Sequence, residues 1–361
     1  MSVRIRLSIV YGGETGHSTS EVSQIGHLGI LEKLGGEMAR NLKIIIAIIV
    51  VLLVAGGVFI YLGYKKKAGQ KETGKEKKGA IQHDPTGPYY HQIYSAISKD
   101  GLTWEKQGKL IFDHASVPGA VIKDGKIFLY FVDAGEAEPQ LSVGISKDLG
   151  KSFEKKKVEI QDIESAQAVD PHPELIDQKI RLYYFYSPAI AGDPGKAEGK
   201  HKFYSATSDD GVIFKNPKLA YEVEELITDP DVFQTEQDWR MFISRGRNLD
   251  LLISADNGIT FQKQPGFSWD KGGVVDTFNF SGIFRTYYCG QGIQSAIGAE
   301  KGKLTIEPGT RIAQEGEMIV CDPSVIQLPD DSYLMFYKVQ KNLPQQNQGP
   351  GQGPGPGQVP M

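Results

Sequence analysis

Four aspartates follow short apolar runs at regular places in this chain. The runs read AVDP, ITDP, VVDT and VCDP, and they place acids at Asp170, Asp229, Asp276 and Asp322. The matching place in the first repeat reads SVPG (116–119) and has no acid. Carboxyl groups that lie close together repel one another, so the pKa of at least one of them rises. Such a pair, with one group as acid and the other as base or nucleophile, is what cleavage of a glycosidic bond needs.

Other polar side chains accompany these acids. His172 and Asp231 stand two places after Asp170 and Asp229, so they share a strand face with them. The residues that we expect to bind a substrate are His172, Asp231, Asp276, Arg245 and Arg247. Two alternatives stay open: a histidine satisfied by backbone groups, and Asp-Pro as a device that starts a strand, with Pro fixing φ. We expect no cofactor and no metal site, although Asp229 and Asp231 could hold a calcium ion.

The elements that must position these residues recur five times between His91 and Gln340, with a period of roughly 45–60 residues. The first half of each repeat is an apolar, β-rich stretch, found at Val117–Asp133, Ala168–Pro188, Thr228–Arg245, Val275–Gly290 and Cys321–Lys338. The second half is a small-residue strand, a tight turn and an aromatic, found at Ile93–Phe112, Leu141–Ile160, Phe203–Tyr221, Leu251–Phe267 and Ile293–Ile312. Four short strands per repeat without a helical period predict an all-β fold, a single five-bladed β-propeller. A β-sandwich array is the alternative.

The order of the halves predicts how the propeller closes. The chain begins with a second half, Ile93–Phe112, and ends with a first half, Cys321–Lys338. If the two pair in one blade, a velcro closure removes the open sheet edge.

Four turns between third and fourth strands share one pattern. They read SKDGLTW (98–104), SKDLGKSF (146–153), SDDGVIF (208–214) and SADNGITF (254–261). The carboxylate of each turn should accept backbone N–H groups, while Gly takes φ > 0 and the aromatic packs between blades. We therefore expect a structural role for Asp100, Asp148, Asp210 and Asp256. The pattern resembles the Asp-box, or BNR repeat, of sialidases.

Over its whole length the repeat region resembles the five-bladed propellers of arabinanase, xylosidase and invertase-like glycosidases, together with sialidase-like proteins. The resemblance implies a glycan ligand at the channel mouth and Asp170, Asp229 and Asp322 as catalytic residues. It also implies a Glu acid, for which no matching motif is present. The nearest candidates are Glu174, Glu164 and Glu317. Whether the domain is an enzyme stays open: it would be a glycoside hydrolase, and the alternative is a non-catalytic binding or scaffold propeller.

The rest of the chain is accessory to residues 89–341. Residues 42–63 form an apolar run of a length that predicts one transmembrane helix. Residues 64–88 read as a Lys-rich tether, and the Gly/Pro/Gln tail 342–361 as disordered. The segment 1–41 has no strong pattern, and Met38 is an alternative start within it.

Charge and cysteine content bear on partners and location. The first 80 residues are Lys-rich, so the remainder is more acidic than the whole-chain charge of −4. An acidic propeller is a poor binder of nucleic acid. The general layout of an anchor, a spacer and one β-domain predicts a membrane-anchored, extracytoplasmic propeller, whereas the positive-inside rule favours the opposite orientation. Cys289 and Cys321 could pair or remain buried thiols.

Overall fold

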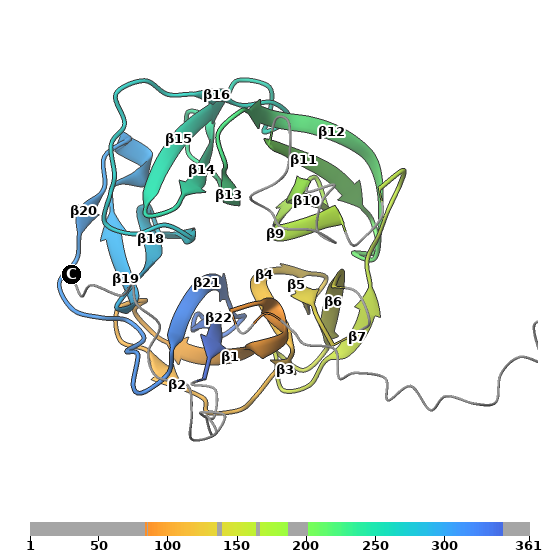
Figure 1. Ribbon diagram of the computed structural model, residues 1–361, viewed down its shortest axis with the longest axis vertical. Helices are drawn as coiled ribbons and strands as arrows, with labels where there is room; N and C mark the ends of the chain where they lie inside the picture. The colour runs from red at the N-terminus through yellow and green to blue at the C-terminus, as the bar shows by residue number, and fades with distance from the viewer. Residues whose placement is uncertain (1–83, 85, 136–138, 164–166, 187–200, 342–361) are drawn as a thin grey trace, which may run out of the picture. The chain divides into compact units, whose positions relative to one another are not determined.

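The computed structural model describes residues 84, 86–135, 139–163, 167–186 and 201–341. They form five mainly antiparallel sheets arranged around an axis, a five-bladed β-propeller (Figure 1). The predicted segments 1–41, 42–63 and 342–361 lie outside these residues. No helix within the described ranges is long and apolar enough to cross a bilayer. Most of the predicted tether, residues 64–88, also lies outside the described residues, and a short 3-10 helix, η1 (Pro88–Tyr90), leads into the first strand.

Four blades each follow one stretch of the chain. The first contains β4 (Ala115–Lys123), β5 (Lys126–Asp133), β6 (Gln140–Ser146) and β7 (Glu154–Lys157). The second contains β9 (Ala168–Ile176), β10 (Lys179–Tyr186), β11 (His201–Ser208) and β12 (Ile213–Val223), with β8 (Glu159–Ile160) beside β12. The third contains β13 (Thr228–Gln234), β14 (Trp239–Arg245), β15 (Asn248–Ser254) and β16 (Gln262–Lys263). The fourth contains β17 (Val275–Phe280), β18 (Ile283–Gly290), β19 (Gly292–Ile297) and β20 (Thr305–Ile306), with the 3-10 helix η4 (Ala299–Lys301).

The fifth blade combines strands from both ends of the described domain. It contains β21 (Ile319–Gln327), β22 (Tyr333–Gln340), β1 (His91–Ser98), β2 (Glu105–Lys106) and β3 (Phe112–Asp113). Strand β1 pairs with β22 over eight residues, from His91 opposite Gln340 to Ser98 opposite Tyr333. In Figure 1 the orange β1 lies beside the dark blue β22. Strands distant in sequence therefore share one sheet.

Alternation along the strands builds the core between blades. Tyr183 and Tyr184 are neighbours on β10, so their side chains point to opposite faces of the sheet. Tyr184 packs with residues of the first blade, and Tyr183 packs with residues of the third blade. Both are fully buried. These two tyrosines therefore join the second blade to both of its neighbours.

The turns between third and fourth strands are held together by the carboxylates of their aspartates. Asp210 Oδ1 accepts hydrogen bonds from the N–H groups of Val212 and Ile213, each at 2.9 Å, and from Ser208 Oγ at 2.8 Å. The carboxylates of Asp100, Asp148 and Asp256 make equivalent bonds in their own turns.

A tyrosine of the preceding blade reaches each of three turns. The hydroxyls of Tyr130, Tyr183 and Tyr287 donate to the carbonyls of Gly211, Gly258 and Gly101 at 2.7–2.8 Å. The aromatic residue of each turn meets the same tyrosine edge to face. Gly258 has a φ of +73°, and a Cβ there would lie 2.6 Å from Tyr183 Oη. Glycine is required because both the backbone and the space exclude a side chain.

Candidate active site at the axial channel

The five inner strands surround the propeller axis and start on the same face (Figure 1). Each contacts the inner strands of the two neighbouring blades. These strands are β4, β9, β13, β17 and β21. Because equivalent positions on them face the axis at the same height, they form rings of side chains. The turns described above lie at the opposite face, since they follow the third strand of each blade.

The first ring, which we call the entry ring, is marked by its backbone. Its members share φ values of 50–52°, and they are Val117, Asp170, Asp229, Val274 and Asp322. This left-handed region is uncommon for non-glycine residues and is strained for β-branched valine. In the blades of Val117, Asp170, Asp229 and Asp322 the strand register shifts at this residue. Such bulges redirect a side chain, here at the start of the channel-lining strand.

The second ring, the inner ring, lies two residues further along each strand. It consists of Gly119, His172, Asp231, Asp276 and Ser324. The sequence pattern placed Asp276 with Asp170, Asp229 and Asp322, and this alignment is wrong. Val274 is the residue of the fourth blade with the entry-ring conformation, whereas Asp276 matches His172 and Asp231. The pairing of β17 with β18 is regular from Val275 onward, so no bulge changes the direction of the Asp276 side chain.

The three entry-ring aspartates form one electrostatic group. The N–H of Asp229 donates to Asp170 Oδ2 at 3.3 Å. Lys338 Nζ, on β22, lies 2.6 Å from Asp322 Oδ2, with side-chain exposures of 13% and 3%. Asp322 Oδ1 is buried and has no hydrogen-bond partner among the described residues. Asp170 and Asp229 retain partial contact with solvent. Asp170 and Asp229 are therefore partly exposed as residues, while the Asp322 carboxylate is buried and paired with an ammonium group.

Burial and charge repulsion raise the pKa values of Asp170 and Asp229. Burial raises the pKa of Asp170 to about 6, an effect that the Asp322 charge reinforces and that the Asp229 N–H and Lys338 oppose. Burial, followed by the charges of Asp170 and Asp322, raises the pKa of Asp229 well above its usual value. Neighbouring carboxyls with separated pKa values can act as a general acid and a general base near neutral pH.

A small cavity of about 30 Å³ lies where the two rings meet, lined by residues of both. This volume matches a single water molecule rather than a sugar ring. A ligand larger than water would contact Asp170 and Asp229 from the outer side of the entry ring.

Inner-ring side chains bond to the backbone of the next blade. Asp231 accepts the Thr277 N–H at 3.0 Å and Thr277 Oγ1 at 2.6 Å. Asp276 Oδ2 accepts the Val325 N–H, and Ser324 Oγ accepts the Ala120 N–H. The inner-ring residue of the first blade, Gly119, has no room for a side chain, since a Cβ would lie 2.2 Å from the Pro171 carbonyl oxygen.

The inner ring thus joins successive blades around the axis. Asp231 and Asp276, which we predicted to bind substrate, are engaged in these inter-blade contacts.

His172 completes the inner ring as a cation. Its Nε2 lies 2.8 Å from the Val232 carbonyl and 3.2 Å from Glu174 Oε1, and its Nδ1 lies 4.0 Å from Asp231 Oδ1. Burial favours the neutral imidazole, but the hydrogen bond that His172 donates to Glu174 and the charges of Asp231 and Asp276 outweigh it and raise the pKa to about 9. Burial raises the pKa of Asp231 to about 6 in spite of the His172 charge. Burial, reinforced by the Asp231 charge, raises the pKa of Asp276 well above its usual value.

Beyond the inner ring the channel opens toward the opposite mouth. A cavity of about 200 Å³ is lined there by His172, Glu174, Phe278, Ser324 and Gln327, among others. Glu174, one of the expected acids, therefore lies in a different compartment from the entry ring. Its position four residues after Asp170 on one extended strand explains the separation.

One set of inner-ring side chains has the make-up of a metal site. The ligand atoms of His172, Asp231 and Asp276 lie within 4.8 Å of one another. Both oxygens of Asp231 already accept hydrogen bonds from Thr277. The pair considered for calcium, Asp229 and Asp231, is divided between the two rings.

The remaining predicted residues do not join the entry ring. Arg245 bonds to Asp250 Oδ1 at 3.0 Å, and Arg247 bonds to the Lys271 carbonyl at 3.2 Å. Glu164 lies outside the described residues. Glu317 lies just before β21, and its Oε2 is buried without a hydrogen-bond partner among the described residues.

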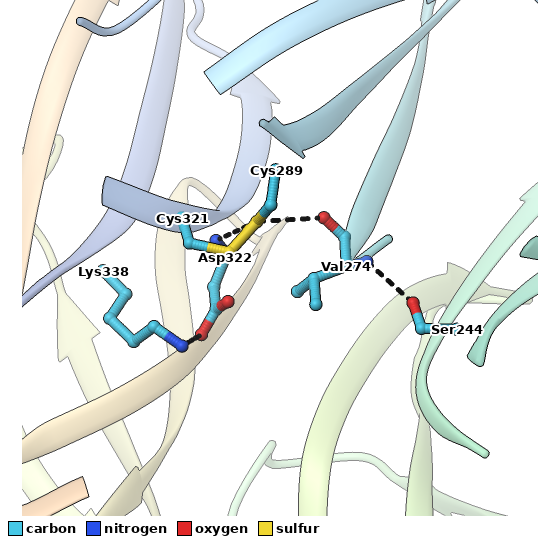
Figure 2. The surroundings of a disulfide bond; sticks show 6 residues. All are labelled: Ser244, Val274, Cys289, Cys321, Asp322 and Lys338. Atoms are coloured by element: carbon cyan, nitrogen blue, oxygen red, sulfur yellow. Dashed lines mark hydrogen bonds and ion pairs between the residues drawn. A yellow bond between two sulfur atoms is a disulfide. The ribbon is translucent and has the colours of Figure 1, made fainter. Parts of the chain in front are cut away.

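Two features beside the entry ring do not follow from the sequence: the state of the two cysteines and the presence of a lysine. Cys289 and Cys321 form a disulfide with Cα atoms 5.1 Å apart, which joins the fourth and fifth blades. Figure 2 shows this bond beside Asp322, whose N–H lies 3.2 Å from Cys289 Sγ, and beside Lys338. The missed residue is Lys338. The strand pairing could have indicated this residue, because Lys338 lies opposite Cys321 on the neighbouring strand and Cys321 directly precedes Asp322.

Comparison with known proteins adds information on the fold alone. No family model matches the chain, and no curated protein matches it. Several solved structures are similar to part of the chain. A thermostable family-43 glycoside hydrolase is 14% identical, with a TM-score of 0.49 over 65% of this chain and 93% of its own.

Two further structures match at similar levels. An α-L-arabinofuranosidase from Lactobacillus brevis is 12% identical, with a TM-score of 0.47 over 62% of this chain and 83% of its own. A family 117 glycoside hydrolase from Zobellia galactanivorans is 12% identical, with a TM-score of 0.46 over 70% of this chain and 91% of its own. At these identities the likeness says nothing about which residues act.

Proposed function

We propose that this propeller is a glycan-active protein whose reacting groups are the entry-ring carboxyls. The observation that carries the proposal is the convergence of Asp170, Asp229 and Asp322 at the channel mouth, where Asp170 and Asp229 are partly exposed residues with raised pKa values. Cleavage of a glycosidic bond requires one protonated and one ionised carboxyl at the same bond.

The roles follow from the surroundings of each group. Asp229, whose pKa is raised by burial and by the charges of both Asp170 and Asp322, donates a proton to the glycosidic oxygen. Asp170, with a pKa of about 6, is the base that activates water. Asp322 touches neither reacting atom in this scheme and supplies a fixed negative charge that raises the pKa of both partners. In this assignment an aspartate takes the place of the expected glutamate acid.

The test is a glycan array followed by hydrolysis assays on the full chain. D170N and D229N should lower kcat by roughly 10²–10⁴-fold, since each removes a proton-transferring group but keeps the volume. Arg245→Gln is a matched control, because Arg245 is bonded to Asp250 outside the ring. Wild-type turnover in both Asn variants would contradict the assignment.

A second candidate is a binding propeller without catalysis. It is favoured by the small cavity at the entry ring, about 30 Å³, which leaves no enclosed pocket for a sugar. Under this alternative a glycan found on the array is bound but not cleaved, and D170N and D229N lower affinity.

We further propose that the propeller acts outside the cytoplasm, tethered through residues 42–63. The disulfide between Cys289 and Cys321 supports an oxidising compartment, where such bonds persist. The test is protease treatment of intact cells that express the full chain. Loss of the propeller from intact cells supports the outward orientation, whereas protection until lysis contradicts it.

A further inference from the structure

Lys338 and Asp322 form a buried ion pair at the edge of the entry ring. Their charged atoms are 2.6 Å apart, and both side chains are largely withdrawn from solvent. Of the Lys and Arg residues that the structure describes, Lys338 alone forms an ion pair with an entry-ring carboxylate. A buried charge is stable only when it is paired, so each member depends on the other.

Both members are held in place by the closing blade. Lys338 on β22 lies between Cys321 on one side and Ile93 on the other. The disulfide precedes Asp322 directly, and the Asp322 N–H lies against Cys289 Sγ (Figure 2). The backbone of Asp322 is thus fixed by a covalent bond and its carboxylate by an ammonium group.

Four titratable groups on four strands face Lys338. Asp322 lies on β21, Asp170 on β9, Asp229 on β13 and His91 on β1, and the Lys338 charge acts on the last three. His91 Nδ1 bonds to Ser116 Oγ at 2.9 Å. Burial and the Lys338 charge lower the pKa of His91 to about 4, so the imidazole is neutral near pH 7. His91 therefore supplies no competing cation, and Lys338 compensates the carboxyls of the ring.

We propose that Lys338 is a positioning residue that keeps Asp322 ionised and oriented, so that the mobile proton of the entry ring resides on Asp170 and Asp229. This inference rests on the proposed function for its catalytic consequence, but its charge arrangement can be tested without a substrate. Without the ammonium group, three carboxyls would share a ring with no cation, so their mutual repulsion would favour uptake of a proton by the ring.

The test compares wild type, K338M and K338M/D322N as full chains, unfolded by urea between pH 5 and 8.5. We expect the free-energy gap between wild type and K338M to widen as pH rises, since an Asp with a raised pKa loses stability on ionising. In K338M/D322N the widening should disappear, because no third carboxyl remains. K338R keeps the charge and should follow wild type.

A matched control is K155M. Lys155 Nζ also lies 2.6 Å from a buried carboxylate, that of Asp133, but this pair lies in the first blade, whose entry-ring residue Val117 carries no charge, and Lys155 is 43% exposed. Its loss should lower stability without affecting the ring. If a glycan is hydrolysed, K338M should move both limbs of the pH–rate profile upward by about one unit, whereas K155M should not move them.

The outcomes separate this inference from the proposed function. The role of Lys338 is overturned if the free-energy difference between wild type and K338M does not change with pH, or if its widening with pH persists in K338M/D322N. This holds even if glycans are hydrolysed. A widening gap that D322N removes supports it even if no glycan is found. If K338M does not fold, a folded K338M/D322N supports the inference. If neither K338M nor K338M/D322N folds, Lys338 serves packing and the inference is overturned.

Discussion

The backbone N–H of Asp229 donates a hydrogen bond of 3.3 Å to the carboxylate of Asp170 on the neighbouring blade. This contact opposes the effect of burial, which raises the pKa of Asp170 to about 6 from its ordinary 3.8. An acid whose pKa is raised by folding costs stability once it ionises. Stability should therefore fall as pH rises from about 4 to about 6.

D170N should remove this cost. At pH 4 the variant should match wild type, and above pH 6 it should be more stable by about 1–2 kcal/mol. Urea unfolding of the full chain across this range is the measurement. A variant that is destabilised equally at both pH values would show that Asp170 serves as a strand-entry device and that its ionisation is not opposed by folding.

His172 should make stability fall over a higher range of pH. Its pKa is raised to about 9 from 6.5, so the stability that its charge contributes is complete below pH 6.5 and is lost as pH rises through about 9. H172Q should cost roughly 2 kcal/mol at pH 6 and much less at pH 9.5. The stability difference between wild type and H172Q, measured at both pH values, tests this. An equal cost at both would mean that packing, and not charge, is what H172Q removes.

The turn carboxylates should act on stability and not on ligand binding. D210A removes the acceptor for two backbone N–H groups and should cost about 1 kcal/mol at pH 7. Asp209 is the matched control, because it is the adjacent, highly exposed acid and pairs only with Lys179 among the described residues. The pKa of Asp210 is lowered in the fold although burial opposes this, because the N–H groups of Ile213 and Val212 bond to it. The cost should therefore shrink as pH falls below about 3.8. Altered glycan binding in D210A would place the turn within a site.

The disulfide should stabilise the contact between the fourth and fifth blades. It closes a loop with a sequence separation of 32, so C289S/C321S should cost about 2–4 kcal/mol of unfolding free energy. A reducing agent should lower the Tm of wild type toward that of the double variant and should leave the variant unchanged. Equal Tm values for oxidised wild type and the variant would show that the bond adds no stability.

The pairing of β1 with β22 makes the closing blade a test of cooperativity. Deletion of residues 321–340 should unfold the whole domain, because β1 would lose its partner over eight residues. Deletion of 345–361 is the control and should leave the melting transition unchanged. A cooperative melt near the wild-type Tm after the first deletion would show that the propeller does not depend on this closure.

The amino-acid sequence by itself determined the number of blades, the position of the strands and the turns that carry Asp100, Asp148, Asp210 and Asp256. These features are local: strand alternation and the Ser-Asp-Gly turn chemistry depend on residues within a few places of one another. Asp170 and Asp229 were also found from sequence, because Asp-Pro after an apolar run marks the start of a channel-lining strand.

Tertiary structure alone decided the composition of the two rings. Asp276 looked equivalent to Asp170 in sequence, but a bulge shifts the register by one residue in four blades and leaves the pairing of β17 with β18 regular. A shift of this size moves a side chain from one ring to another without changing the apolar pattern around it. The pairing of β21 with β22 likewise brings Lys338 to Asp322, and the packing of the fourth blade against the fifth brings Cys289 to Cys321.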